Sequence, residues 1–113
     1  MVVHGGDLLF RSRVGASLVD RALRPLLRVA DAGVQVLLVP GNHERSAIPC
    51  ALLAVHENLH VFRAPPTVVV ERRGLRVAFA GFPHARDVRR AFPALLAATG
   101  YRGMPADARV LCV

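Results

Sequence analysis

The sequence predicts a single layered α/β domain over residues 1–113, and three observations support this prediction. Short valine-rich runs alternate with longer segments whose apolar residues recur at helical spacing, a pattern typical of α/β proteins. Two β-rich runs on either side of Arg72-Arg73-Gly74 indicate an antiparallel hairpin. No linker, internal repeat or low-complexity run divides the chain, and its length suits one domain.

The predicted elements follow one another in the order β-α-β-α-β-ββ-α-β. Strands are expected at residues 1–4, 34–39, 59–62, 67–71, 75–80 and 109–113, and helices from Ser17 to Gly33, from Ser46 onward and over 88–99. Ser17 is the expected N-cap of the first helix, and Gly33 is its natural C-terminal stop. Pro25 should kink this helix because it removes one backbone hydrogen bond. Pro93 is a position at which the last helix could begin.

The net charge of +7 comes entirely from arginine, since the chain has no lysine. Most of these arginines are scattered, which favours a compositional bias over a dedicated binding surface. Arginine nevertheless suits phosphate contact because its planar side chain donates two parallel hydrogen bonds. Three local groups are therefore candidates for phosphate contact: Arg11/Arg13, Arg72/Arg73 and Arg86/Arg89/Arg90.

The compartment and the cysteines are predicted from composition. No uninterrupted apolar run reaches the roughly 18 residues that a membrane-spanning helix needs, and no signal peptide is expected because Asp7 follows the first apolar residues at once. We therefore predict a soluble, cytoplasmic protein with no membrane partner. Cys50 and Cys112 lack a C-x-x-C context, so we expect both to be small buried hydrophobic residues.

Two strand-to-loop turns carry the residues best suited to ligand binding or catalysis. The apolar run Val36–Val39 ends in Pro-Gly and is followed by Asn42, His43 and Glu44. The first strand ends in Gly-Gly and is followed by Asp7. In open α/β sheets, ligands bind beyond the carboxyl ends of the strands. These two turns are therefore expected to form a site together.

Gly6-Asp7, followed about 35 residues later by Gly41-Asn42-His43-Glu44, resembles the calcineurin-like metallophosphoesterases. That family carries the blocks D-x-H, G-D-x-x-D, G-N-H-D/E, a single histidine and G-H-x-H. The resemblance implies a β-sandwich flanked by helices, here as an incomplete, internal part of the domain. Within the family, the interval between the two blocks and the later hairpin are most similar to the DNA-repair exonuclease (SbcD-like) branch.

The resemblance also implies a chemistry and a set of partners. It implies two divalent metal ions, manganese first with iron, zinc and magnesium as alternatives, which activate water and clamp a phosphate. Asp7 would bridge the ions, Asn42 would complete the ligands of one, and His43 would contact the phosphate and protonate the leaving oxygen. Candidate substrate-lining residues are His84, Glu44 and Arg45. The implied partners are a phosphate ester, including DNA, and an ATPase subunit.

Departures from the family pattern lead to a second hypothesis. The D-x-H and G-H-x-H blocks are not found, and Phe10 stands where G-D-x-x-D has its second aspartate. Of the family's metal ligands, only Asp7 and Asn42 are matched in this sequence. We therefore expect this chain to be inactive alone and to bind no metal pair by itself. The alternative is a non-catalytic module of the same fold that serves as a protein-interaction or structural fragment through an exposed sheet edge.

Overall fold

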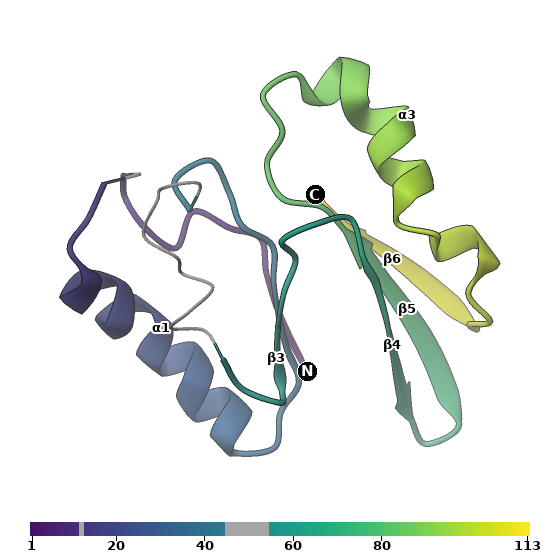
Figure 1. Cartoon of the computed structure of the whole chain (residues 1–113). Helices are drawn as coiled ribbons and strands as arrows, with labels where there is room; N and C mark the ends of the chain where they lie inside the picture. The colour runs from purple at the N-terminus through teal and green to yellow at the C-terminus, as the bar shows by residue number, and fades with distance from the viewer. Residues whose placement is uncertain (12, 45–54) are drawn as a thin grey trace.

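The computed structural model describes residues 1–11, 13–44 and 55–113, and Figure 1 shows the path of the chain. The described elements are β1 (Val2–His4), α1 (Ala16–Asp31), β2 (Val36–Leu38), β3 (Leu59–Val61), β4 (Thr67–Arg72), β5 (Leu75–Gly81), α3 (Val88–Ala98), the 3₁₀ helix η1 (Tyr101–Gly103) and β6 (Ala108–Cys112). The predicted α/β class is confirmed. The helix predicted from Ser46 and the prediction for Cys50 lie outside the described residues.

Two three-stranded sheets organise the described chain. In the first sheet, β1, β2 and β3 are all parallel, with Val2 opposite Val36 and Leu37 opposite His60. In the second sheet, β4 pairs antiparallel with β5, and β5 pairs parallel with β6. Because β1 and β2 are parallel neighbours, the loops that follow them leave from the same end of the sheet.

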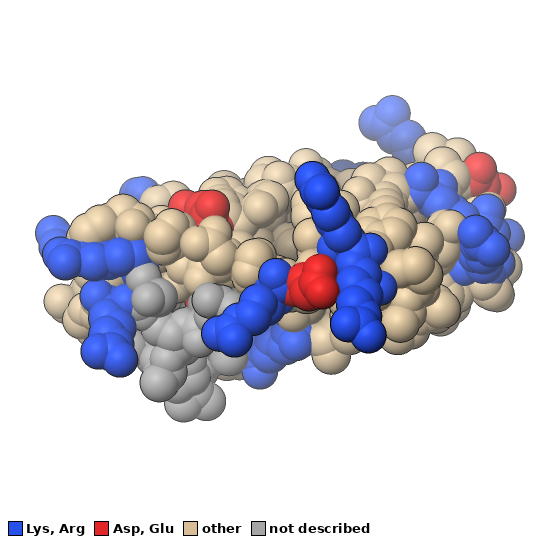
Figure 2. All heavy atoms as spheres, turned by 90° about the horizontal axis from the view of Figure 1, so that it is seen from above, with Lys and Arg blue, Asp and Glu red and all other residues tan. Residues whose placement is uncertain are grey.

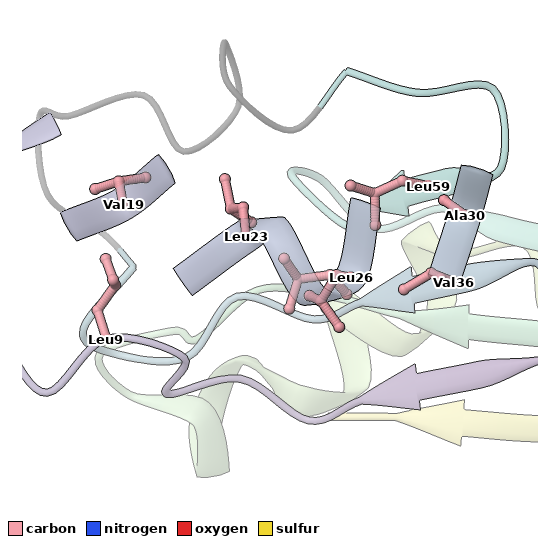
Figure 3. Close-up of a cluster of buried hydrophobic side chains, with 8 residues drawn as sticks. Leu9, Val19, Leu23, Leu26, Ala30, Val36 and Leu59 are labelled. Carbon is pink, nitrogen blue, oxygen red and sulfur yellow. The ribbon is translucent and has the colours of Figure 1, made fainter. Parts of the chain in front are cut away.

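One face of the first sheet packs against helix α1. The helix buries Val19, Leu23, Leu26 and Ala30, four residues at the spacing that the sequence predicted. They contact the side chains of Leu9, Val36, Leu38 and Leu59, and Figure 3 shows this cluster. Each fully buried leucine or valine here contributes about 1.5–3 kcal/mol through burial of apolar surface. The helix therefore holds β2 from one side.

The opposite face of the first sheet packs against the second sheet. Leu37 and Val39 share a cluster with Phe62, Phe79 and Cys112. β2 is consequently buried on both faces, which explains why its sequence is a continuous apolar run rather than an alternating one. The prediction that Cys112 is a buried small residue is confirmed.

Helix α3 lies over the second sheet on the side away from α1, as Figure 1 shows. The rings of Phe82 and Phe92 meet edge to face with centroids 5.9 Å apart. The hydroxyl of Thr67 donates to the carbonyl of Thr99 at 2.7 Å. Gly100 then ends the helical segment in the left-handed region, with φ +67°.

The structure corrects several local predictions. Ser17 is not the N-cap of α1: the cap is Gly15, whose carbonyl accepts from the amides of Leu18 and Val19. α3 contains Pro93 rather than beginning at it, whereas Pro25 lies inside α1, where the sequence placed it. Both prolines are exposed, so the carbonyl that each leaves without a helical partner can bond to water.

The hairpin prediction is confirmed, with Arg73 at φ +52° and Gly74 at φ +78° in a two-residue turn between β4 and β5.

In the described parts of the chain, no helix combines the length and the apolar character needed to cross a membrane.

Candidate functional site

A cavity of about 340 Å³ lies at the carboxyl ends of β1, β2 and β5. Its polar lining residues are Asp7, Asn42 and His84, each from a different strand-exit loop. Much of the remaining lining is apolar, including Val39, Phe82 and other hydrophobic side chains. A few polar groups converging in an otherwise apolar cavity are typical of a small-molecule site. The structure thus brings three of the residues singled out in the sequence to one place.

Glu44 joins the two loops that carry Asp7 and Asn42. Its Oε2 accepts from the amide of Asp7 at 2.8 Å and from the amide of Gly41 at 2.7 Å. Its Oε1 accepts from the amide of Leu9 at 2.8 Å. The residue is only 8% exposed, and these three charge-assisted hydrogen bonds offset the cost of burying its carboxylate. Glu44 therefore anchors the loops, and it is not among the residues that line the cavity.

Two glycines allow these loops to approach each other backbone to backbone. A Cβ added to Gly6, at φ +93°, would lie 2.6 Å from the amide nitrogen of Gly41. A Cβ on Gly41 would clash with the carboxylate and the backbone of Asp7. Asp7 itself has φ +53°, an uncommon conformation that aspartate tolerates better than most residues. The close approach of the two loops therefore leaves no room for a Cβ at Gly6 or Gly41.

The two candidate histidines occupy different positions. His43 is half-buried, and its backbone amide donates to Oδ1 of Asp7 at 3.5 Å. Its side chain is not part of the cavity lining described above. His84 is exposed on the cavity wall, and its amide donates to the carbonyl of Pro40 at 3.0 Å. That hydrogen bond joins the loop after β5 to the loop after β2. Arg45 lies outside the described residues.

Two side chains in the lining of this cavity carry oxygen donors that suit a metal ion. Asp7 and Asn42 offer a carboxylate and an amide oxygen, which suit hard divalent cations. Among residues 1–11, 13–44 and 55–113, no group of three or more His, Cys, Asp or Glu side chains could hold a metal ion.

Phe10 lies in the loop that follows β1. Its side chain is 65% exposed, and the guanidinium of Arg11 lies 4.5 Å from the centre of its ring. Leu9, beside it, is buried in the core under α1. The loop after β1 therefore presents an aromatic ring to solvent.

Sequence reasoning did not identify the anchoring role of Glu44. The sequence placed it directly after Asn-His, where it resembled one more site residue. The available signal was the block of two glycines and an aspartate in the first loop, whose backbone amides need an acceptor when two loops meet. Only the contact between the loops shows which carboxylate supplies it.

Comparison with known proteins adds no assignment, since neither the family models nor the curated proteins contain a match to this chain.

Proposed function

We propose that this domain is part of a metal-dependent phosphoesterase that hydrolyses phosphodiesters of DNA or nucleotides, and that the chain alone does not turn over. One observation carries the proposal: Asp7 and Asn42 come from two separate strand-exit loops, yet they line one cavity and are tied together by Glu44. A metallophosphoesterase-type layering of the two sheets and helices is part of the same proposal.

Each residue has a distinct role in this proposal. Asp7 and Asn42 supply oxygen ligands for a divalent cation, manganese first, and the remaining ligands are not among the described residues. When bound, such ions neutralise charge on the phosphate and lower the pKa of bound water. His43 would contact the phosphate and protonate the leaving oxygen, and His84 would line the substrate cleft. The exonuclease branch, an ATPase partner subunit and a cytoplasmic location belong to the proposal as well.

Manganese binding tests the role of the two oxygen donors. Titration followed by the electron paramagnetic resonance signal of free Mn²⁺ should show weak binding that Asp7→Ala abolishes and Asn42→Ala weakens. Gln35→Ala is the matched control, because Gln35 lies at the other end of the sheet and lines a different cavity. Equal affinity in the wild type and in Asp7→Ala would contradict the proposal.

Hydrolysis of bis-p-nitrophenyl phosphate tests the proposal that the chain alone does not turn over. With Mn²⁺ present, we expect no turnover above background, because two ligands do not define a two-metal centre. Robust turnover that His43→Ala abolishes would show instead that this chain is an enzyme without further ligands.

A second candidate function is a non-catalytic module that binds a protein partner. The observation that favours it is apolar exposure on the edge strands β1 and β6, where Val2, Val3, Val110 and Leu111 are each more than a third exposed. Unpaired strand edges with apolar side chains favour association. Light scattering after size exclusion should then show self-association that Val110→Lys reduces, while Mn²⁺ has no effect on it.

A further inference from the structure

A separate cavity, of about 360 Å³, lies between the carboxyl-terminal half of α3 and the 3₁₀ helix η1. It shares no lining residue with the cavity that contains Asp7. Its volume is at the small end of the range of about 300–1,000 Å³ that is typical of ligand pockets. This α3–η1 cavity therefore suits a small ligand. Its described lining residues are Pro93, Leu96, Ala97, Gly100, Tyr101, Arg102 and Gly103.

The corner between α3 and η1 is held to the second sheet by hydrogen bonds. Thr99 is buried, and its carbonyl accepts from the hydroxyl of Thr67 on β4 at 2.7 Å. Arg109 of β6 donates from its guanidinium to the carbonyl of Tyr101 at 3.2 Å and to that of Met104 at 2.9 Å. The wall of the cavity is therefore formed before a ligand arrives, which lowers the entropic cost of binding.

The helical wall of the cavity is apolar and only partly covered. Pro93, Leu96 and Ala97 contribute to it, and no residue of α3 is fully buried by the described chain. In Figure 1, α3 lies on the outer side of the second sheet. An apolar group that enters the cavity would remove some of this surface from water, which is favourable.

Arg102 is the one charged side chain among the described lining residues. Its Nε donates to the hydroxyl of Tyr101 at 3.3 Å, and its guanidinium lies 5.8 Å from the centre of that ring. Neither of the two ion pairs between described residues includes Arg102. The two terminal nitrogens of a guanidinium can donate parallel hydrogen bonds to one carboxylate. The cavity therefore combines an apolar wall with a positioned cation.

Charge alone does not select this cavity. Figure 2 shows arginine side chains at many places on one face of the molecule, with few acidic side chains between them. The carbonyl end of a helix also disfavours an anion, but the carbonyls of Leu96 and Ala97 already accept backbone hydrogen bonds. The distinguishing feature of the cavity is the apolar helix wall beside the arginine.

We propose that the α3–η1 cavity binds a small amphipathic carboxylate, with its carboxylate on the guanidinium of Arg102 and a short apolar tail against the helix wall. The site goes beyond the proposed function, because it shares no residue with the cavity that contains Asp7 and Asn42 and needs no metal ion.

The test is a titration of the full chain with octanoate in EDTA, followed by amide NMR spectra. We expect saturable shifts of the amides of Gly100 and Gly103, which line the cavity, and none at Gly33, which lines the other apolar cavity. Octanol, which lacks the charge, should bind several-fold more weakly than octanoate, and acetate, which lacks the tail, should not bind. Octanol binding as tight as that of octanoate, or shifts centred on Gly33, would overturn the proposal.

A pair of arginine variants tests the contact with the carboxylate. Arg102→Gln should weaken octanoate binding about fivefold, the upper end for an exposed ion pair, and leave octanol binding unchanged. The matched control is Arg72→Gln, which removes the same charge from the lining of the other apolar cavity and should bind octanoate as the wild type does. Equal losses in the two variants would contradict the proposal, because they would show a response to net charge alone.

A pair of alanine variants tests the place of the tail. Ala97→Leu adds bulk at the cavity wall and should weaken the binding of octanoate and octanol alike, by about tenfold. Ala94→Leu, the matched control, makes the same change at an exposed position of α3 outside the lining and should bind both as the wild type does. Leucine and alanine are both good helix formers, so the helix is retained in each variant. Equal octanoate binding by the two variants would reject the cavity as the place of the tail.

Discussion

The two ends of the sheets each carry a cavity, but the cavities differ in chemistry. The cavity at the carboxyl ends of β1 and β2 contains Asp7, Asn42 and His84. The cavity at the opposite end, of about 260 Å³, is lined by residues such as Val34, Leu75 and Phe79 and has no acidic or histidine side chain in its lining. The difference arises because parallel strands all deliver their following loops to one end.

The loops at the two ends also differ in how closely they are packed. At the carboxyl end, Gly6 lies against the backbone of Gly41. At the opposite end, Gly33 has a similar positive φ of +76°, but nothing lies within 4 Å of the position of a Cβ. Gly6 is therefore needed both for its positive φ and for its missing Cβ, whereas Gly33 is needed for its positive φ alone.

The largest expected effect comes from Gly6→Ala. The new Cβ must displace the backbone of Gly41 as well as adopt a positive φ, so we expect a loss of about 3 kcal/mol or more. Gly33→Ala, the matched control, bears only the conformational cost of about 1 kcal/mol. Urea unfolding measures both. Equal losses would show that the two loops are not in tight contact.

The next largest effect is expected for Glu44→Ala. Removing the carboxylate leaves the amides of Asp7, Leu9 and Gly41 without their acceptor, which we expect to cost about 3 kcal/mol. Glu44→Gln keeps one acceptor oxygen and should lose less. The opposite end supplies the control: Gln35→Ala removes hydrogen bonds to Asn58 and His60 that water can replace, at about 1 kcal/mol or less.

Urea unfolding of the three variants decides whether the anchor is specific to the carboxyl end. A Glu44→Ala variant no less stable than Gln35→Ala would reject the anchoring role. A stable Glu44→Ala variant that had lost Mn²⁺ binding would show instead that Glu44 positions Asp7 without stabilising the fold.

The smallest effect concerns the core between the sheets and depends on pH. Burial raises the pKa of the Cys112 thiol above its ordinary value of 9.0. As the pH rises through that ordinary value, the unfolded state loses this proton first, so stability should fall until the folded thiol also ionises. In a Cys50→Ala background, Cys112→Val should remove this part of the alkaline loss. An unchanged profile would show that Cys112 is not buried in the folded state.

The main features of the fold could be predicted because they depend on local patterns. The spacing of Val19, Leu23, Leu26 and Ala30 specified an amphipathic helix, and Gly74 specified the hairpin turn. The capping prediction at Ser17 was wrong because Gly15, two residues earlier, begins the helix with its carbonyl alone. Pro93 does not begin α3, because a proline on the exposed side of a helix leaves its orphan carbonyl to water and can be accommodated inside the helix.

The candidate site was predictable only in part. Its polar residues could be located because a short apolar run followed by Gly and Asp, or by Gly-Asn-His, indicates the end of a buried strand. Their grouping followed from the parallel pairing of β1 and β2. The neighbouring position of His84 depended on how the second sheet meets the first, which no local pattern encodes.

The sequence by itself determined the α/β class, most strand and helix positions and the residue types at the strand exits, because these depend on periodicity and turn chemistry within short segments. The tertiary structure alone decided that Glu44 is an anchor, that Gly6 and Gly41 touch, and that His84 lines the same cavity as Asp7 and Asn42. Those relations join residues that are far apart in the chain. They arise only when the two sheets bury their shared apolar faces and bring separate loops to one end of the molecule.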